Sequence, residues 1–325
     1  MGRNETLILL EFGVFSTCAL LSLAAFTGLP LHVPNSDTIG FIIKHYVGPI
    51  SLGAILALLV QSFRISWQTL ASIATHFISV SLICFTHFNL KLLAMLINKA
   101  NFDLLFWKLD QKIIVEIGFG EWLYDQLGLF DCAELGWYHD IFVALFFIVL
   151  LLAAKDKWLF ECIMGICVIL ILGGGCYALL PAWGPFIFEQ QEISYPIQKD
   201  MLQFYQEFIL TRGTAYKPSN FIMAVAAMPS LHVAHSAFFA LMVWTRSKAW
   251  FGLFLVFCTY LAWSAIILKW HYSLDVIGSL GLSIFAWWLM TNIKQTGLGR
   301  LRLRLRAMLF CIGMGLIFIY WINGK

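Results

Sequence analysis

Long apolar runs, separated by short polar segments, fill most of this chain. Each run is close to the roughly 20 residues that an α-helix needs to cross a lipid bilayer, whereas a barrel strand needs only about 10. The pattern therefore predicts about nine spanning helices. They fall at residues 7–27, 42–63, 68–88, 138–154, 158–180, 227–245, 249–268, 271–292 and 305–322.

The stretch 89–137 has a different pattern. Its apolar residues recur at helical spacing, but acidic residues interrupt them, and aromatic residues are frequent. Aromatic side chains gather at membrane–water boundaries, so we expect helices that lie on the membrane surface.

The predicted fold is therefore all-α, a polytopic transmembrane helical bundle with interfacial helices at 89–137. We expect a single membrane domain over residues 1–325. Its parts are the N-terminal spans with the interfacial helices (1–137), a catalytic core (138–292), and a basic loop with the last span (293–325).

Composition agrees with a membrane protein. Hydrophobic residues make up 61% of the chain and charged residues 12%, with a mean hydropathy of +0.83. Soluble domains have about 45–50% apolar and about 25% charged residues. The net charge of +3 gives no sign of nucleic-acid binding. The eight cysteines lack the paired spacing of metal sites, so we expect them to be small buried apolar residues.

Basic residues indicate the orientation of the chain. The first apolar run has no clear cleavage site, so we expect a retained span, with a cleaved signal peptide as the alternative. Short basic loops face the cytoplasm, which places the N-terminus there. The run RLRLRLR at 300–306 is expected to touch acidic lipid headgroups. The basic residues on that side are Arg3, Arg64, Lys155, Lys157, Arg246, Lys248, Lys294, Arg300, Arg302, Arg304 and Arg306.

Candidate chemistry collects on the opposite, non-cytoplasmic side. His232 and His271 each open a predicted span there, and the segment PAWGPF (181–186) closes another. Asp275 follows His271 by four residues, so the two side chains share one helix face. Ionisable residues in spanning segments are costly and usually functional. We expect Asp275 to accept a hydrogen bond from one imidazole nitrogen of His271, leaving the other as a nucleophile.

His232 follows two residues suited to a helix start, Pro229 and Ser230. Ser230 is a natural N-cap, and a helix N-terminus binds anions readily. A phosphate held there would meet His232, which could protonate a leaving oxygen. One turn later, His235 is expected to be buried structure.

These residues resemble a known family. The sequence MPSLH at 228–232, followed by HYSLD at 271–275, is similar to the second and third motifs of the type 2 phosphatidic acid phosphatase superfamily. The fit is best to the branch that includes inositol phosphorylceramide synthases and sphingomyelin synthases. The stretch PAWGP after an apolar helix also resembles that branch, and NFDLLFWKLD (101–110) does so weakly.

The resemblance implies a six-helix catalytic core and a role for each residue. His271 would form a phosphohistidine, Asp275 would orient it, and His232 would protonate the leaving group. Ser230, next to Pro229, and nearby backbone amides would bind phosphate.

The chain also departs from the superfamily. It lacks the first motif, Lys followed six residues later by Arg-Pro, and has Ser264–Ala265 where the third motif has Ser-Arg. Leu231 replaces the glycine that often precedes the histidine of the second motif. Phosphoryl transfer needs positive groups on the phosphate oxygens. The candidate substitutes are Lys269, Arg212 and Lys217, and the other candidate substrate-binding residues are Trp183 and Ser264.

We therefore expect a membrane enzyme that transfers or hydrolyses a lipid-borne phosphate or phosphodiester, without a metal or cofactor. Because fewer cations suit a singly charged diester, transfer of a phospho-headgroup to a second lipid or glycan is favoured over hydrolysis. The expected site is periplasmic, extracellular or lumenal, in a bacterial inner membrane. A transporter that relays protons through its intramembrane His and Asp, and an inactive lipid-binding relative, remain as alternatives.

Overall fold

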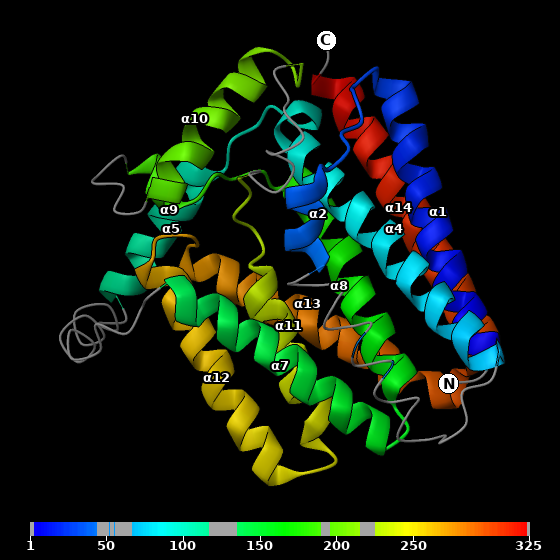
Figure 1. Ribbon diagram of the computed structural model, residues 1–325. Coiled ribbons are helices and arrows are strands. Elements are labelled where there is room, and N and C mark those ends of the chain that lie inside the picture. The colour runs from blue at the N-terminus through cyan, green and yellow to red at the C-terminus, as the bar shows by residue number, and fades with distance from the viewer. Residues whose placement is uncertain are drawn as a thin grey trace.

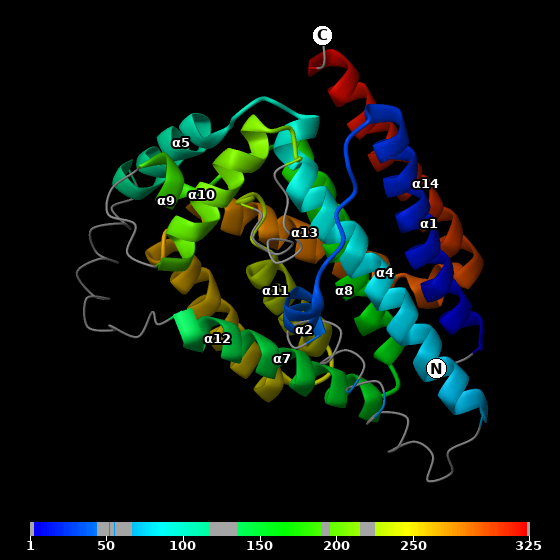
Figure 2. The ribbon, with the colours of Figure 1, turned by 45° about the horizontal axis from the view of Figure 1, so that its top comes forward.

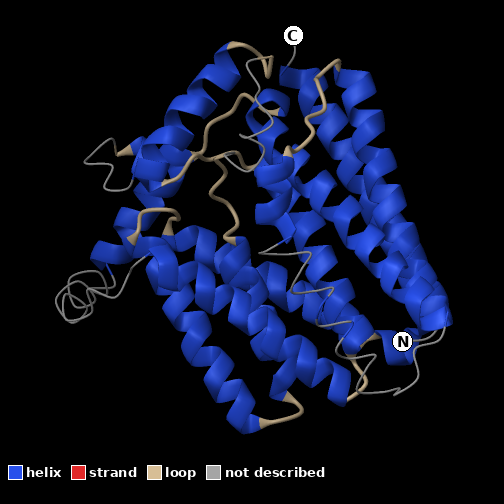
Figure 3. Ribbon diagram, viewed as in Figure 1, coloured by secondary structure: helices blue, strands red, loops and turns tan. Residues whose placement is uncertain are grey.

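The computed structural model describes residues 3–43, 52, 55, 67–116, 135–189, 196–214 and 225–323. Within these ranges the chain is helical and has no strand (Figure 3), which confirms the predicted all-α bundle. The helices are α1 (Arg3–Thr27), α2 (Ser36–Ile42), α4 (Trp67–Ile97), α5 (Asp103–Glu116), α7 (Leu135–Lys155), α8 (Leu159–Leu179), α9 (Pro185–Phe188), α10 (Pro196–Leu210), α11 (Leu231–Trp244), α12 (Lys248–Ile267), α13 (Ser273–Thr291) and α14 (Ile293–Asn323).

Seven helices in the described part of the chain are long and apolar enough to cross a membrane: α1, α4, α7, α8, α12, α13 and α14. The expected span at 227–245 is a shorter apolar helix, α11, which starts only at Leu231. The expected span at 42–63 lies almost entirely outside the described residues.

Helix α8 forms the centre of the bundle, and nearly all of its residues are buried. It packs against α4, α7, α11, α13 and α14, while α1, α4 and α14 group on one side of it (Figures 1 and 2). Glycines permit this packing. A Cβ at Gly173 would lie 2.4 Å from Leu231 of α11, and one at Gly174 would lie 3.1 Å from Leu90 of α4. Gly281 of α13 differs, because a Cβ there would meet nothing within 4 Å.

Two serines of α13 join it to α11. The Ser279 hydroxyl donates to the carbonyl oxygen of Ser230 at 2.8 Å, and the Ser283 hydroxyl donates to that of Ala234 at 2.7 Å. Both serines are buried. These bonds align the starts of the two helices, which are the ends that carry the candidate chemistry.

The predicted surface stretch 89–137 begins later than expected. Helix α4 continues to Ile97, because 90–97 is apolar apart from Lys91 and packs into the core. Helix α5 follows at the end of the bundle beside α9 and α13 (Figure 2). It turns Asp103 and Asp110 inward and leaves Leu104 and Leu105 half exposed. An outward apolar face with buried acids is the reverse of an ordinary soluble surface helix. Residues 117–134 lie outside the described ranges.

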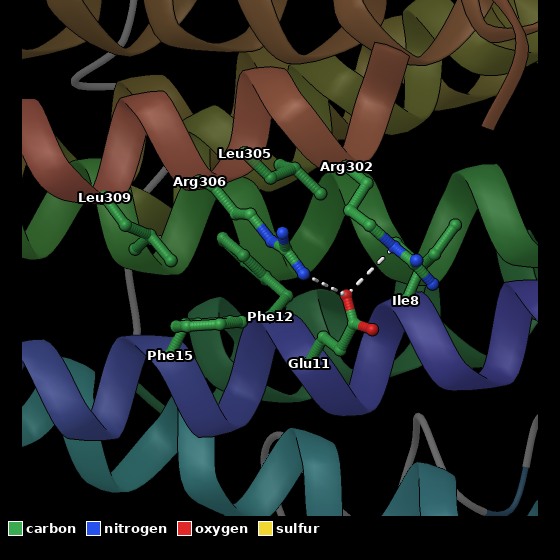
Figure 4. Close-up of a pocket in the computed structure, with 8 residues that line it drawn as sticks. All are labelled: Ile8, Glu11, Phe12, Phe15, Arg302, Leu305, Arg306 and Leu309. Carbon is green, nitrogen blue, oxygen red and sulfur yellow. Dashed lines mark hydrogen bonds and ion pairs between the residues drawn. The ribbon is translucent and has the colours of Figure 1, made fainter. Parts of the chain in front are cut away.

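The basic loop predicted before the last span, within 293–325, is helical instead, because residues 300–306 belong to α14, which kinks at Gly297. Residues four apart lie on the same face of α14. Leu301 and Leu305 are buried, while Arg302 and Arg306 both face α1. Each contacts the Glu11 carboxylate, at 2.9 Å and 3.3 Å (Figure 4). The basic run therefore fastens α14 to α1.

Candidate active site

Three loops meet where α11 and α13 begin. The Ala227 N–H donates to the Ala182 carbonyl at 2.9 Å, and the Phe186 N–H donates to the Lys269 carbonyl at 3.0 Å. Gly184, with φ 101°, allows the close approach, since a Cβ there would lie 2.8 Å from the Trp270 carbonyl oxygen. The structure thus joins the PAWGPF segment to the loops that carry the two histidine motifs.

His271 lies in the loop before α13. Its Nδ1 is 2.7 Å from the Ala227 carbonyl oxygen and 3.4 Å from Oδ2 of Asp275. A carbonyl oxygen can only accept, so Nδ1 carries the hydrogen and Nε2 carries the lone pair. This tautomer leaves Nε2 as the ring atom that could act as a nucleophile.

Asp275 is fully buried in the first turn of α13. Its Oδ2 also accepts the Tyr272 N–H at 2.8 Å, while Oδ1 has no hydrogen-bond partner among the described residues. The carboxylate thus holds the loop next to His271 and places a negative charge beside the imidazole.

His232, in the first turn of α11, is surrounded by aromatic rings from α7. The ring centroids of Phe142, Tyr138 and His139 lie 4.3 Å, 4.8 Å and 5.5 Å from that of His232. His271 lies within electrostatic reach of His232. Sequence reasoning missed this enclosure, although Tyr138 and Phe142 share a helix face by their spacing.

Ser230 takes the N-cap position of α11, but its side chain does not cap the helix. Its hydroxyl oxygen is buried and has no partner among the described residues, and Pro229 beside it is buried as well. A helix's first-turn amides have no acceptor within the helix. An anion placed here would find a hydroxyl, backbone N–H groups and His232.

Two of the other predicted binding residues have structural partners, and the third is buried without one among the described residues. Lys269, with φ 56°, pairs its ammonium with the Glu189 carboxylate at 2.7 Å. The Trp183 backbone N–H donates to Oδ2 of Asp103 at 2.8 Å. Ser264 is buried in α12, and its hydroxyl has no partner among the described residues.

Arg212, another predicted cation, is not brought to the histidines. Gln198 of α10 donates to the Leu268 carbonyl at 3.0 Å, which places the start of α10 near the site. Arg212 is exposed beyond the other end of α10, about 20 Å further along the helix axis. Lys217 lies outside the described residues.

Two acids of α5, missed as site residues, position the loops. Asp103 accepts the Gly184 N–H at 2.8 Å and the Tyr272 hydroxyl at 3.0 Å, both through Oδ1. Asp110 accepts the Ser273 N–H at 2.7 Å. Acids seven residues apart share a helix face, which is the signal that could have found them.

Burial raises the pKa of the Asp103 and Asp110 carboxyl groups, although the hydrogen bonds they accept oppose this shift. Burial, followed by the Asp103 charge, also raises the pKa of the Tyr272 hydroxyl. These groups therefore act as hydrogen-bonded supports next to His271. Within the described ranges, no three His, Cys, Asp or Glu side chains are grouped so that they could hold a metal ion.

Comparison with known proteins gives one match. No curated protein and no solved structure matches the chain. The sequence model of the PAP2 superfamily matches residues 109–289, more than half of the 325 residues. The matched region contains both histidines, Asp275 and the three joined loops. It leaves out α1, α4 and all of α14. The match over most of the helical core shows that the chain belongs to the PAP2 superfamily.

Proposed function

We propose that this protein is a membrane lipid phosphotransferase that works through a phosphohistidine on His271. The observation that carries the proposal is the hydrogen bond between Nδ1 of His271 and the Ala227 carbonyl. This bond leaves the lone pair on Nε2. The start of α11, whose backbone N–H groups can bind an anion, lies beside it. The branch that contains inositol phosphorylceramide and sphingomyelin synthases is the proposed place within the superfamily.

In the first step, Nε2 of His271 attacks the phosphorus of a lipid phosphodiester, and the bond from phosphorus to the leaving oxygen breaks. His232, as an imidazolium, gives its proton to that oxygen. The Asp275 carboxylate, 3.4 Å from Nδ1, stabilises the positive charge that His271 gains. Ser230 and the first amides of α11 hold the phosphoryl oxygens.

In the second step, a hydroxyl of the acceptor attacks the phosphorus, and the nitrogen–phosphorus bond breaks. His232, now neutral, takes the acceptor's proton and returns to its starting state. Both histidines are thus regenerated without a metal or cofactor.

The scarcity of cations favours transfer over hydrolysis of a monoester. A phosphate monoester carries up to two negative charges and a diester carries one. Ala265, at the position of the superfamily's arginine, is fully buried, and Glu189 already neutralises Lys269. We propose a lipid donor, a lipid or glycan hydroxyl as acceptor, and a site on the non-cytoplasmic face of a bacterial inner membrane.

The test uses protein purified in detergent as wild type, His271→Gln and Asp275→Asn. A matched control is His76→Gln, which replaces a buried histidine on α4 far from the site. Each is offered phosphatidic acid, a polyprenyl diphosphate, and a phosphodiester lipid with an alcohol acceptor. Headgroup exchange by wild type and the control, absent in His271→Gln and at least tenfold slower in Asp275→Asn, supports the proposal.

Release of inorganic phosphate without headgroup exchange would replace transfer by hydrolysis at the same site. Equal rates in wild type and His271→Gln would remove the catalytic assignment. Acid-labile phosphorus bound to wild type, but not to His271→Gln, would identify the intermediate directly.

A further inference from the structure

Lys91 carries a charge inside the spanning part of α4. Its neighbours Leu90, Leu92 and Leu93 are buried and apolar, and Lys91 itself is partly buried. A cation in such a segment is costly, and it usually faces a partner or a functional cavity. No carboxylate in the described part of the chain forms an ion pair with it.

The Lys91 ammonium faces the centre of the bundle. Nζ lies 5.8 Å from the ring centroid of Tyr177 in α8. Tyr177 follows Gly173 by four residues, so both lie on one face of α8. At Gly173 that face contacts Leu231, the residue before His232. The cation therefore lies along the surface of α8 against which the start of α11 packs.

Lys91 also lies within electrostatic reach of two imidazoles, His87 one turn earlier in α4 and His232. His87 contacts the Leu170 carbonyl at 2.8 Å through Nδ1. Among the described residues, no carboxylate forms an ion pair with Lys91 to supply a negative charge. Burying a cation without a counter-charge is unfavourable, so an anion near Lys91 would stabilise this arrangement.

The two other candidate cations that the structure describes do not fill this role. Lys269 is neutralised by Glu189, and Arg212 lies beyond the far end of α10. Lys91 also lies outside the region matched by the superfamily, so neither the motifs nor the match points to it.

We propose that Lys91 binds a non-bridging phosphoryl oxygen of the substrate next to His232. This inference rests on the proposed function and extends it, because one ammonium matches the single negative charge of a phosphodiester. A charge-assisted hydrogen bond of this kind would hold the phosphorus during both steps of the transfer.

The test compares wild type with Lys91→Met, which keeps the stem and removes the charge, and Lys91→Arg, which restores a charge. Lys91→Gln is the second neutral variant if Lys91→Met does not fold. The matched control is Lys248→Met, because Lys248 also lies over an aromatic ring, Trp244 at 4.3 Å, but at the opposite end of α11 from His232.

We expect kcat/KM for headgroup transfer to fall about 10- to 100-fold in Lys91→Met, partly recover in Lys91→Arg, and stay unchanged in Lys248→Met. The concentration of orthovanadate, a phosphate-like oxyanion, that half-maximally raises the melting temperature should increase at least tenfold in Lys91→Met only. Values within twofold of wild type in both assays would overturn the role of Lys91.

The experiments distinguish failure of the proposed function from failure of the proposed role of Lys91. If wild type transfers no headgroup and releases no phosphate from any lipid, the proposed function falls. The orthovanadate comparison between wild type and Lys91→Met still decides whether Lys91 belongs to an anion site.

Discussion

At the candidate nucleophile, His271, the backbone carbonyl of Ala227 sets the tautomer of the imidazole ring. The Ala227 carbonyl is nearer to Nδ1 of His271 than the Asp275 carboxylate is, at 2.7 Å against 3.4 Å. The carbonyl can fix the tautomer without any change of charge. The carboxylate contributes mainly by stabilising positive charge on the ring. This division explains why Asp275→Asn is expected to slow the enzyme and His271→Gln to abolish activity.

A second residue, His32, is expected to make the free energy of unfolding depend on pH. It is buried between α1 and α2, its N–H donates to the Asn89 side chain at 2.9 Å, and its ring meets Phe208 at 5.2 Å. Burial lowers its pKa from 6.5 to about 4. Between these values the unfolded chain binds a proton that the folded chain does not, so the free energy of unfolding falls as pH drops from 6.5 toward 4.

We therefore expect His32→Phe, which keeps an aromatic ring against Phe208, to remove this loss. Melting temperatures in detergent at pH 7.5 and pH 4.5 measure it. Wild type should lose more stability between the two pH values than the variant does. An identical loss in both proteins would show that His32 does not carry the effect.

Among the elements, α5 positions two loops of the site although it is not one of the candidate spans. Its Asp103 holds the PAWGPF segment and Tyr272, and its Asp110 holds the start of α13. Both loops adjoin His271. A short helix at the bundle's end thus positions the candidate catalytic groups that other helices carry.

A double-mutant cycle with Asp103→Asn and Tyr272→Phe tests this role. Because the Tyr272 hydroxyl donates to a buried carboxylate at 3.0 Å, we expect a coupling energy of about 1.5–3 kcal/mol in unfolding experiments. Both single variants should also reduce headgroup transfer. Asp200→Asn, on the exposed surface of α10, is the matched control and should change neither quantity. A coupling near zero would mean that α5 does not hold the loop through this bond.

For the whole molecule, the bundle has a basic end and a histidine end. Arg246, after α11, lies over the ring of Trp158, before α8, at 4.4 Å. This contact joins two basic turns, the turn between α7 and α8 and the turn between α11 and α12. The histidines lie at the other end of α11. Positive loops face the cytoplasm, so this polarity supports a site on the non-cytoplasmic side.

Cysteine labelling in intact cells tests this orientation. The eight native cysteines are replaced first. Single cysteines are then placed at exposed Lys157, in the basic turn, and exposed Asp200, in α10 near the site. A membrane-impermeant maleimide should label Asp200→Cys in intact cells and Lys157→Cys only after the membrane is opened. The reverse pattern would place the site in the cytoplasm.

The sequence alone predicted most of the long apolar helices and the shared end of the bundle that carries His232, His271 and Asp275, but not the short helices α9 and α10. These features depend on local properties, because apolar run length decides which segments span and four-residue spacing decides which side chains share a face. The same local reading misplaced the start of the surface stretch and the form of 300–306. Packing of 89–97 into the core and the pairing of Glu11 with α14 depend on other helices.

Only the tertiary structure decided the supporting contacts of the site. Asp103 and Tyr272 lie 169 residues apart in the chain, and Ala227 and His271 lie 44 apart. The charge of Lys91 is visible in the sequence, but its approach to His232 depends on how α4, α8 and α11 pack. Periodicity cannot reveal such partners, since it describes which way a side chain faces along its own helix and not what meets it there.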